Sequence, residues 1–212
     1  MLSNYLHEFL GLALIHFLAV VAPGPDFAVT IRQSIRFGRW VGICTAIGIG
    51  AGISVHVIYT LIGVGALIHS TPWLMTAAKI MGGVYICYLG IQFIRSKPEQ
   101  ADFVLSHDAP VQQQSLQRAF FTGFMTNATN PKATLFFLAV FTTVVSTTTP
   151  LSVQVFYGVW MCIVNAVWFI LVSWLFSNPL IRMKFIRMGY WFERGIGIIL
   201  IGFAARLVFL TV

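Results

Sequence analysis

The tetrapeptide Pro23-Gly24-Pro25-Asp26 follows a run of apolar residues and constrains the fold of this chain more than any other feature. Two prolines and a glycine interrupt a helix because they free backbone groups that the helix would otherwise pair. A carboxylate in the hydrocarbon of a bilayer costs about 2.5–3.5 kcal/mol or more. An acid at a helix break in apolar surroundings therefore indicates a functional site.

The composition places the chain in a membrane. Of its 212 residues, 58% are hydrophobic and only 9% are charged, whereas about a quarter of the residues of a soluble domain are charged. A net charge of +7 would suit nucleic acid, but the basic residues lie scattered between apolar segments and form no basic stripe. We therefore expect contact with membrane lipid, whose anionic head groups attract such residues, and no nucleic acid.

Six apolar segments approach the roughly 20 residues that a helix needs to cross a bilayer. This pattern predicts an all-α membrane protein of about six transmembrane helices. The second segment also has the small-residue spacing that lets helix backbones approach closely, through Gly42, Gly48, Gly50 and Gly52. The six segments are 6–22, 40–68, 73–94, 119–145, 151–176 and 196–212.

Basic residues occur in alternate connections between these segments. The connections around 70–72 and 146–150 carry no Lys or Arg. The positive-inside rule then predicts three cytoplasmic connections and both termini outside, unless the first segment re-enters, which would reverse the N-terminus. The basic residues are Arg32, Arg36 and Arg39, then Arg95, Lys97 and Arg118, and finally Arg182, Lys184, Arg187 and Arg194.

A second helix break, Asn130-Pro131-Lys132, lies just past the midpoint and suggests an internal repeat. We predict a first three-helix repeat over 1–95, a cytoplasmic linker over 96–118 and a second repeat over 119–212. An odd number of spans in each repeat inverts the second one, and paired broken helices in inverted repeats mark the binding site of many secondary transporters. The glycine pair 83 and 90 recurs at 195 and 202, although chance similarity between glycine-rich helices is the alternative.

Asp26 is the leading candidate for chemistry. Proline suits the first position of a helix, so Pro25 predicts a helix from Asp26 to about Ser34, and Pro131 predicts another behind an Asn130 cap. Two helix N-termini at one point would form a seat for a carboxylate ligand; a pair of kinks patched by neighbouring helices is the alternative. Asp26 could exchange protons, accept the ammonium group of an amino acid, or do both in turn.

Other polar residues lie near the breaks or inside apolar segments. Asn127 and Lys132 flank the second break, and Lys132 pairs with Asp26, binds a substrate carboxylate or reaches toward the interface. His16 and His56 could relay protons, although a buried histidine more often serves packing. We add His56, Asn165 and Lys79 as further candidates, although a helix–helix hydrogen bond is the alternative for Asn165. The chain lacks zinc, phosphate-loop and dinucleotide motifs, so we expect no cofactor and no metal.

Together these residues resemble the LysE/RhtB family of bacterial amino-acid exporters and match its threonine/homoserine-type branch well. The resemblance runs essentially end to end. It implies proton-driven export of small amino acids or their derivatives across the bacterial inner (cytoplasmic) membrane. The motifs that carry it are Pro23-Gly24-Pro25-Asp26, Arg32 and Gly38, Gly82-Gly83-Val84-Tyr85, Leu89-Gly90, Phe121-Thr122-Gly123-Phe124 and the stretch from Asn127 to Lys132. Its signature residues here are Pro23, Gly24, Pro25, Asp26, Asn127, Asn130, Pro131 and Lys132.

Three alternatives to an exporter differ in what they predict. A passive channel would ignore an imposed pH gradient, and a non-transporting membrane subunit would tolerate the loss of Asp26. An intramembrane enzyme is disfavoured because its nearest nucleophile and base, Cys44 and His56, lie about 120° apart around a helix. The sequence leaves open the amino acid, the proton stoichiometry and the oligomeric state, since glycine-lined faces suit a homodimer and internal packing equally.

Overall fold

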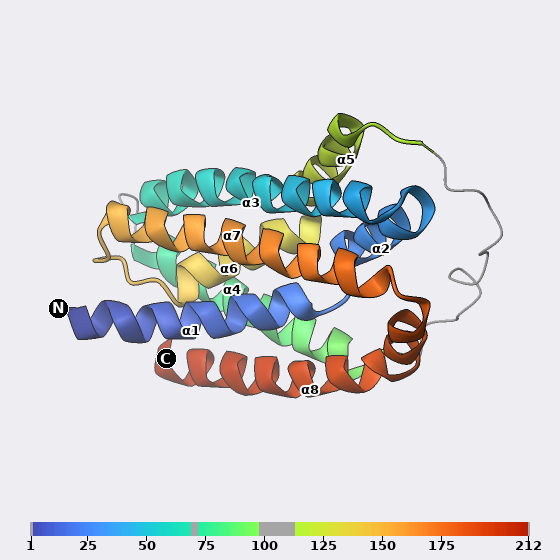
Figure 1. Cartoon of the computed structure of the whole chain (residues 1–212). Coiled ribbons are helices and arrows are strands. Elements are labelled where there is room, and N and C mark those ends of the chain that lie inside the picture. The colour runs from blue at the N-terminus through green and yellow to red at the C-terminus, as the bar shows by residue number, and fades with distance from the viewer. Residues whose placement is uncertain (1, 69–71, 98–112, 212) are drawn as a thin grey trace.

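The computed structural model describes residues 2–68, 72–97 and 113–211, and every regular element within these ranges is a helix (Figure 1). This confirms the all-α prediction. The helices are α1 (Leu2–Val21), α2 (Pro25–Phe37), α3 (Arg39–Ile68), α4 (Pro72–Ile94), α5 (Leu116–Ala128), α6 (Pro131–Thr143), α7 (Leu151–Phe176) and α8 (Pro179–Thr211).

Both predicted helix breaks are confirmed. Helix α1 ends at Val21 and α2 begins at Pro25, with a bend of 51° between them. The fourth apolar segment is likewise two helices, α5 and α6, separated at Thr129 and Asn130. At 13 residues each, these two helices are about 20 Å long, too short to cross a bilayer singly.

The start of the last helix differs from the prediction. A loop was expected to reach residue 195, but α8 begins at Pro179 and takes in the basic positions from 182 to 194. The side chain of Asn178 accepts a hydrogen bond from the backbone N–H of Leu180, 2.9 Å away, which caps the helix at this point. Lysine and arginine are good helix formers, so their charge did not mark a loop.

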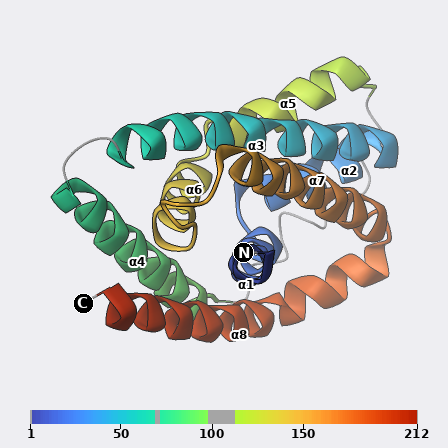
Figure 2. The same ribbon diagram turned by 90° about the vertical axis from the view of Figure 1, so that its left-hand side faces the viewer.

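The helices form two groups around α1 and α6. Helices α3, α5 and α7 pack together on one side, while α4 and α8 pack against each other on the other. Figure 2 shows α1 and α6 between these groups. The largest buried cluster fills this interior, where Leu12 and Ile15 of α1 meet Phe137, Val140 and Phe141 of α6.

Glycines let α3 approach its neighbours closely, as its small-residue spacing predicted. A Cβ on Gly48 would overlap the backbone carbonyl oxygen of Phe120 in α5, and one on Gly123 of α5 would overlap the carbonyl oxygen of Thr45. Gly50 approaches Ala166 of α7 in the same way. These contacts hold α5 and α7 against α3 backbone to backbone.

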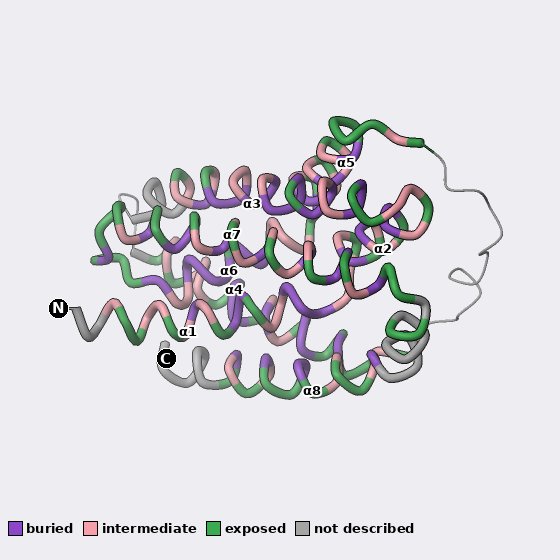
Figure 3. The backbone as a smooth tube through the Cα atoms, in the orientation of Figure 1, coloured by how far each residue is buried: buried purple, intermediate pink, exposed green. Residues whose placement is uncertain are grey.

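The outward faces suit a lipid surrounding. Buried residues line the inner sides of the helices (Figure 3). Large apolar residues such as Met81 (70% exposed) and Ile62 (69% exposed) lie on the surface. Within the described ranges, α4, α7 and the 39–63 part of α3 are long and apolar enough to cross a membrane, and α1 with α2 forms one further bent apolar unit. The predicted number of six spans is not established by this criterion.

The basic connections between helices lie at one end of the molecule. In Figure 1 the α2–α3 and α7–α8 connections lie at one end of the molecule, together with the end of α4 and the start of α5. The start of α1 and the end of α8 lie at the opposite end. All three predicted basic connections thus share one end, and residues 98–112 of the predicted linker fall outside the described residues.

Candidate functional site

The first break presents an acid at the start of a helix. Helix α2 has Gly24 as its N-cap in extended conformation and Pro25 in its first turn, and no side chain caps it. The first α2 backbone bond runs from the Ala28 N–H to the Gly24 carbonyl at 2.9 Å. Asp26 therefore lies in the first turn, where the positive end of the helix dipole favours a negative charge.

The second break follows the same plan but caps itself. Pro131 occupies the first turn of α6, and the side-chain oxygen of Asn130 accepts a hydrogen bond from the Lys132 N–H at 3.0 Å. The Thr134 N–H bonds to the Asn130 carbonyl at 3.0 Å. The predicted roles of Asn130 as cap and Pro131 as first helical residue are confirmed.

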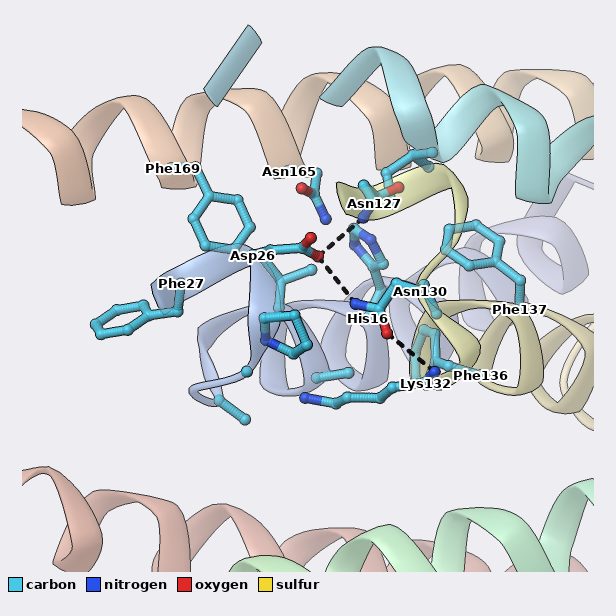
Figure 4. Close-up of a pocket in the computed structure, with 17 residues that line it drawn as sticks. His16, Asp26, Phe27, Asn127, Asn130, Lys132, Phe136, Phe137, Asn165 and Phe169 are labelled. Carbon is cyan, nitrogen blue, oxygen red and sulfur yellow. Dashed lines mark hydrogen bonds between the residues drawn. The ribbon is translucent and has the colours of Figure 1, made fainter. Parts of the chain in front are cut away.

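Asp26 joins the two breaks. The Asn127 side-chain amide donates to Asp26 Oδ2 at 2.9 Å, across 101 positions of sequence. The Asn130 amide approaches the same oxygen at 3.5 Å. The acid of the first half and the two amides of the second half thus meet at one point (Figure 4).

Lys132 lies beside this cluster. Its Nζ is 3.4 Å from the point where a Cβ on Gly24 would stand, and it lies 4.9 Å from the centre of the Phe93 ring. Its charge is attracted to Asp26 and, on the other side, to Glu193 of α8. The Tyr85 hydroxyl donates to the Lys132 carbonyl at 3.2 Å and holds this turn of α6 against α4. A cation and an acid therefore face the same gap between the breaks.

A pocket lies where the two breaks meet. It is open on one side, and the space that the centre of a water molecule can occupy in it is about 50 Å³, which is room for a few water molecules. Residues from α1, α2, α3, α5, α6 and α7 and from both breaks contribute to its wall. They are His16, Ala19, Val20, Ala22, Gly24, Pro25, Asp26, Phe27, Ile53, Asn127, Asn130, Lys132, Ala133, Phe136, Phe137, Asn165 and Phe169.

Several buried polar atoms in this wall make no hydrogen bond within the described part of the protein. Three are oxygens that accept hydrogen bonds, namely Asp26 Oδ1, Asn127 Oδ1 and Asn165 Oδ1. The others are both ring nitrogens of His16. Buried polar groups are nearly always paired, so an unpaired set around one pocket marks where water or a polar ligand would bond. Three acceptors beside a lysine suit a ligand that carries a hydrogen-bond donor at one end and an anion at the other.

The structure separates the sequence candidates. Gly24, Pro25, Asp26, Asn127, Asn130 and Lys132 line the pocket, and so does Asn165, for which a plain helix–helix hydrogen bond was the alternative. Pro23 and Pro131 shape the breaks without lining it, and Lys79 lies on α4 away from it.

The two histidines of interest have different surroundings. His56 stands behind Asn127, with Nε2 2.8 Å from the Asn127 carbonyl oxygen and Nδ1 2.7 Å from the Tyr59 hydroxyl. It does not line the pocket, whereas His16 does. Sequence reasoning weighed the two histidines equally and retained His56, because nothing local to either residue shows which one has partners.

The described residues contain no group of three or more His, Cys, Asp or Glu side chains placed to hold a metal ion. The polar groups of the pocket are of the kinds that bind small organic ligands. Amide, carboxylate and ammonium groups bind such ligands through hydrogen bonds and charge.

Comparison with known proteins places this arrangement among transporters. The sequence profile of the family described as LysE type translocator matches residues 17–211. The threonine efflux protein of Escherichia coli K12 is 30% identical over 203 residues, which cover 94% of this chain and 97% of the relative. The threonine efflux protein of Salmonella typhi is 29% identical over 202 residues, covering 94% and 97%. An uncharacterized membrane protein of Haemophilus influenzae is 25% identical over 201 residues, covering 94% and 95%. No solved structure matches the chain.

Proposed function

The chain belongs to the family of LysE type translocators, and from this premise we propose that it is a secondary active exporter of small amino acids or their derivatives, of the threonine/homoserine kind, driven by proton antiport. As a multi-pass helical protein of a bacterial family, it lies in the inner (cytoplasmic) membrane. The amino-acid part of the proposal is supported by the threonine efflux relatives, and the proton part depends on the chemistry of Asp26.

The observation that carries the proposal is the set of unpaired acceptors opposite a lysine. An amino acid carries an ammonium group with three donors and a carboxylate with acceptors only. The ammonium group would bond to Asp26 Oδ1, which has no partner among the described residues. The carboxylate then faces Lys132 and the start of α2, where no side chain caps the helix.

Asp26 offers a physical basis for exchange. Its Oδ2 already accepts from Asn127, so Oδ1 is the oxygen left for a ligand. A proton on Oδ1 removes both the negative charge and the acceptor that an ammonium group needs. Proton and substrate therefore compete for one atom, and such competition couples their movements in opposite directions across the membrane.

Movement of the two halves would expose the site to each side in turn. We propose that the segments 1–95 and 119–212 act as inverted repeats that move against each other at α1 and α2, because α3 of the first segment is held backbone to backbone against α5 and α7 of the second. The Asp26–Asn127 hydrogen bond crosses this division, so the site can register the relative position of the halves. One charge crossing 100 mV gives about 2.3 kcal/mol, enough for a gradient of nearly fiftyfold per proton.

The test is uptake of labelled amino acids into inverted membrane vesicles, with and without an acid-inside gradient. We expect the gradient to drive uptake of threonine-like amino acids by the wild type. Asp26→Asn keeps the shape and one acceptor but removes the charge, and should abolish the response to the gradient. Glu8→Gln is the matched control, since Glu8 bonds to Thr149 at the outer end of α1 and does not line the pocket.

Other outcomes would support other functions. Uptake that ignores the gradient would indicate a passive channel. Correctly inserted wild-type protein that carries no amino acid would contradict the exporter, and together with a harmless Asp26→Asn it would favour a non-transporting subunit.

A further inference from the structure

His16 is the polar side chain of the pocket that the proposed mechanism leaves unused. It lies on α1 and is 1% exposed. Neither ring nitrogen has a hydrogen-bond partner among the described residues. The other polar side chains of the wall are those of Asn165, of Lys132 and of the Asp26 cluster, which consists of Asp26, Asn127 and Asn130. A second polar subsite, separate from the groups that suit an ammonium or a carboxylate, is therefore present.

The surroundings of His16 are apolar. Its ring centre lies 6.3 Å from that of Phe136, 6.2 Å from that of Phe137 and 5.7 Å from that of Trp160. Ala19, one turn along α1, also lines the pocket. Figure 4 shows Phe136 and Phe137 on the opposite side of the pocket from Phe27 and Phe169, with His16 between. This wall suits a small, largely apolar group that carries one polar atom.

The chemistry of imidazole narrows that polar atom to a hydroxyl. A neutral ring has one N–H donor and one bare nitrogen acceptor. A hydroxyl both donates and accepts, so it can bond to whichever nitrogen faces it, in either tautomer. An ammonium group can bond only to the bare nitrogen and a carboxylate only to the N–H, and the proposed site already holds these two groups at Asp26 and Lys132. A methyl group can bond to neither nitrogen. A substrate with an apolar side chain would leave the imidazole unpaired, which buried polar groups avoid.

We propose that His16 forms the side-chain subsite of the transporter and selects small amino acids with a side-chain hydroxyl over apolar analogues of the same shape. The inference rests on the proposed function, because it assumes that the pocket binds an amino acid. It adds a residue that determines specificity within the substrate class already proposed. The Asp26 cluster binds the ammonium group and Lys132 binds the carboxylate, which all amino acids share. His16 binds the side chain, which differs between them.

The test compares substrates that differ only by hydroxyl and methyl, namely threonine with valine, and serine with 2-aminobutyrate. Initial rates of gradient-driven uptake into inverted vesicles give kcat/KM for each. We expect the wild type to prefer the hydroxyl member of each pair by at least about tenfold, since a site built to bond a hydroxyl rejects analogues that lack it. His16→Phe keeps an aromatic ring and should reduce each preference to about threefold or less.

Two further variants separate recognition from packing. His16→Gln keeps a donor and an acceptor and should retain most of the preference for threonine. His56→Phe makes the same chemical change at a histidine that supports Asn127 from outside the pocket. It should lower uptake of threonine and valine in parallel and leave their ratio unchanged. An unaltered ratio in His16→Phe would overturn the proposal.

A measurement on the wild type covers the case in which His16→Phe fails to insert. The chain has five histidines, and ¹⁵N-labelled imidazoles of purified protein can be assigned with His16→Gln. Threonine should shift the His16 resonances, and valine at equal occupancy should leave them in place. If the wild type carries all four amino acids without preference, the subsite is wrong while the exporter stands. If it carries none, the proposed function itself has failed.

Discussion

The two helix breaks follow one plan and end in different states. Each places proline in the first turn of a 13-residue helix, α2 in the first half and α6 in the second. The first break carries an acid, Asp26, behind a glycine cap that makes no side-chain hydrogen bond. The second carries a base, Lys132, behind Asn130, whose side chain caps the helix. The second break is thus completed within the chain, while the first leaves a helix start without a side-chain cap.

The helix beside the second break is also packed more closely against α3 than the helix beside the first break. Helix α5, which leads to the second break, meets α3 backbone to backbone at Gly48 and Gly123. Helix α2, which follows the first break, meets α3 through a side chain, because a Cβ on Gly42 would overlap the Ser34 hydroxyl. Backbone atoms in contact can shift less to relieve an overlap than the atoms of short side chains can. We infer that α3 and α5, one helix from each half, form a fixed frame and that α2 places the reactive acid against it.

The largest effect is expected from breaking the frame. Gly48→Ala places a methyl group against the carbonyl of Phe120 and should lower the free energy of unfolding by about 1–3 kcal/mol or prevent insertion. Gly42→Ala should cost less, because it meets side chains. Gly63→Ala, with nothing within 4 Å, is the control in the same helix. Thermal unfolding in detergent measures all three, and equal midpoints for Gly48→Ala and Gly63→Ala would contradict the rigid frame.

The next effect tests the opposite charges of the two breaks. Lys132→Met keeps a long apolar stem but removes the cation that faces the substrate carboxylate, so KM for the amino acid should rise at least about tenfold, or 1.4 kcal/mol. Unlike Asp26→Asn, this variant should still respond to the pH gradient, because Asp26 remains.

Lys79→Met is the comparison for that experiment. Lys79 is the other lysine within an apolar segment that the sequence suggested as a candidate, and it does not line the pocket. Vesicle uptake at several substrate concentrations should show its KM unchanged. A loss of gradient response in Lys132→Met with KM unchanged would mean that the lysine serves proton coupling and not substrate binding.

The smallest effect comes from giving the first break the cap that the second already has. Gly24→Ser adds a hydroxyl that can accept a hydrogen bond from a backbone N–H in the first turn of α2, where no side chain caps the helix. This should stabilise the protein by a few tenths of a kcal/mol, about the usual gain for serine over glycine at an N-cap. The same hydroxyl competes with the substrate carboxylate, so KM should rise several-fold. Gly24→Ala adds only a methyl at van der Waals distance from Lys132 and should change KM less; equal KM values for the two variants would argue against a ligand at this helix start.

Local sequence predicted both breaks, their helices and the Asn130 cap. It also contains a pattern that predicts where the last helix begins. Asn178-Pro179-Leu180 repeats the pattern of Asn130-Pro131-Lys132, and both asparagines cap the N–H two residues on. The start of α8 was therefore predictable, although the positive charges after it favoured a loop. His16 offered no comparable signal, because its role depends on residues from five other helices.

Local sequence is enough to predict that this protein is helical, lies in a membrane and breaks its helices at two places. Those outcomes follow from hydropathy and from the missing N–H of proline, which act in the same way whatever lies nearby. Which polar groups meet depends instead on how the helices pack. Asp26 reaches Asn127 across 101 positions, His56 gains partners for both ring nitrogens, and His16 faces the pocket with none among the described residues. The reason is that these contacts depend on how closely α3 lets α5 and α7 approach, which no single segment specifies.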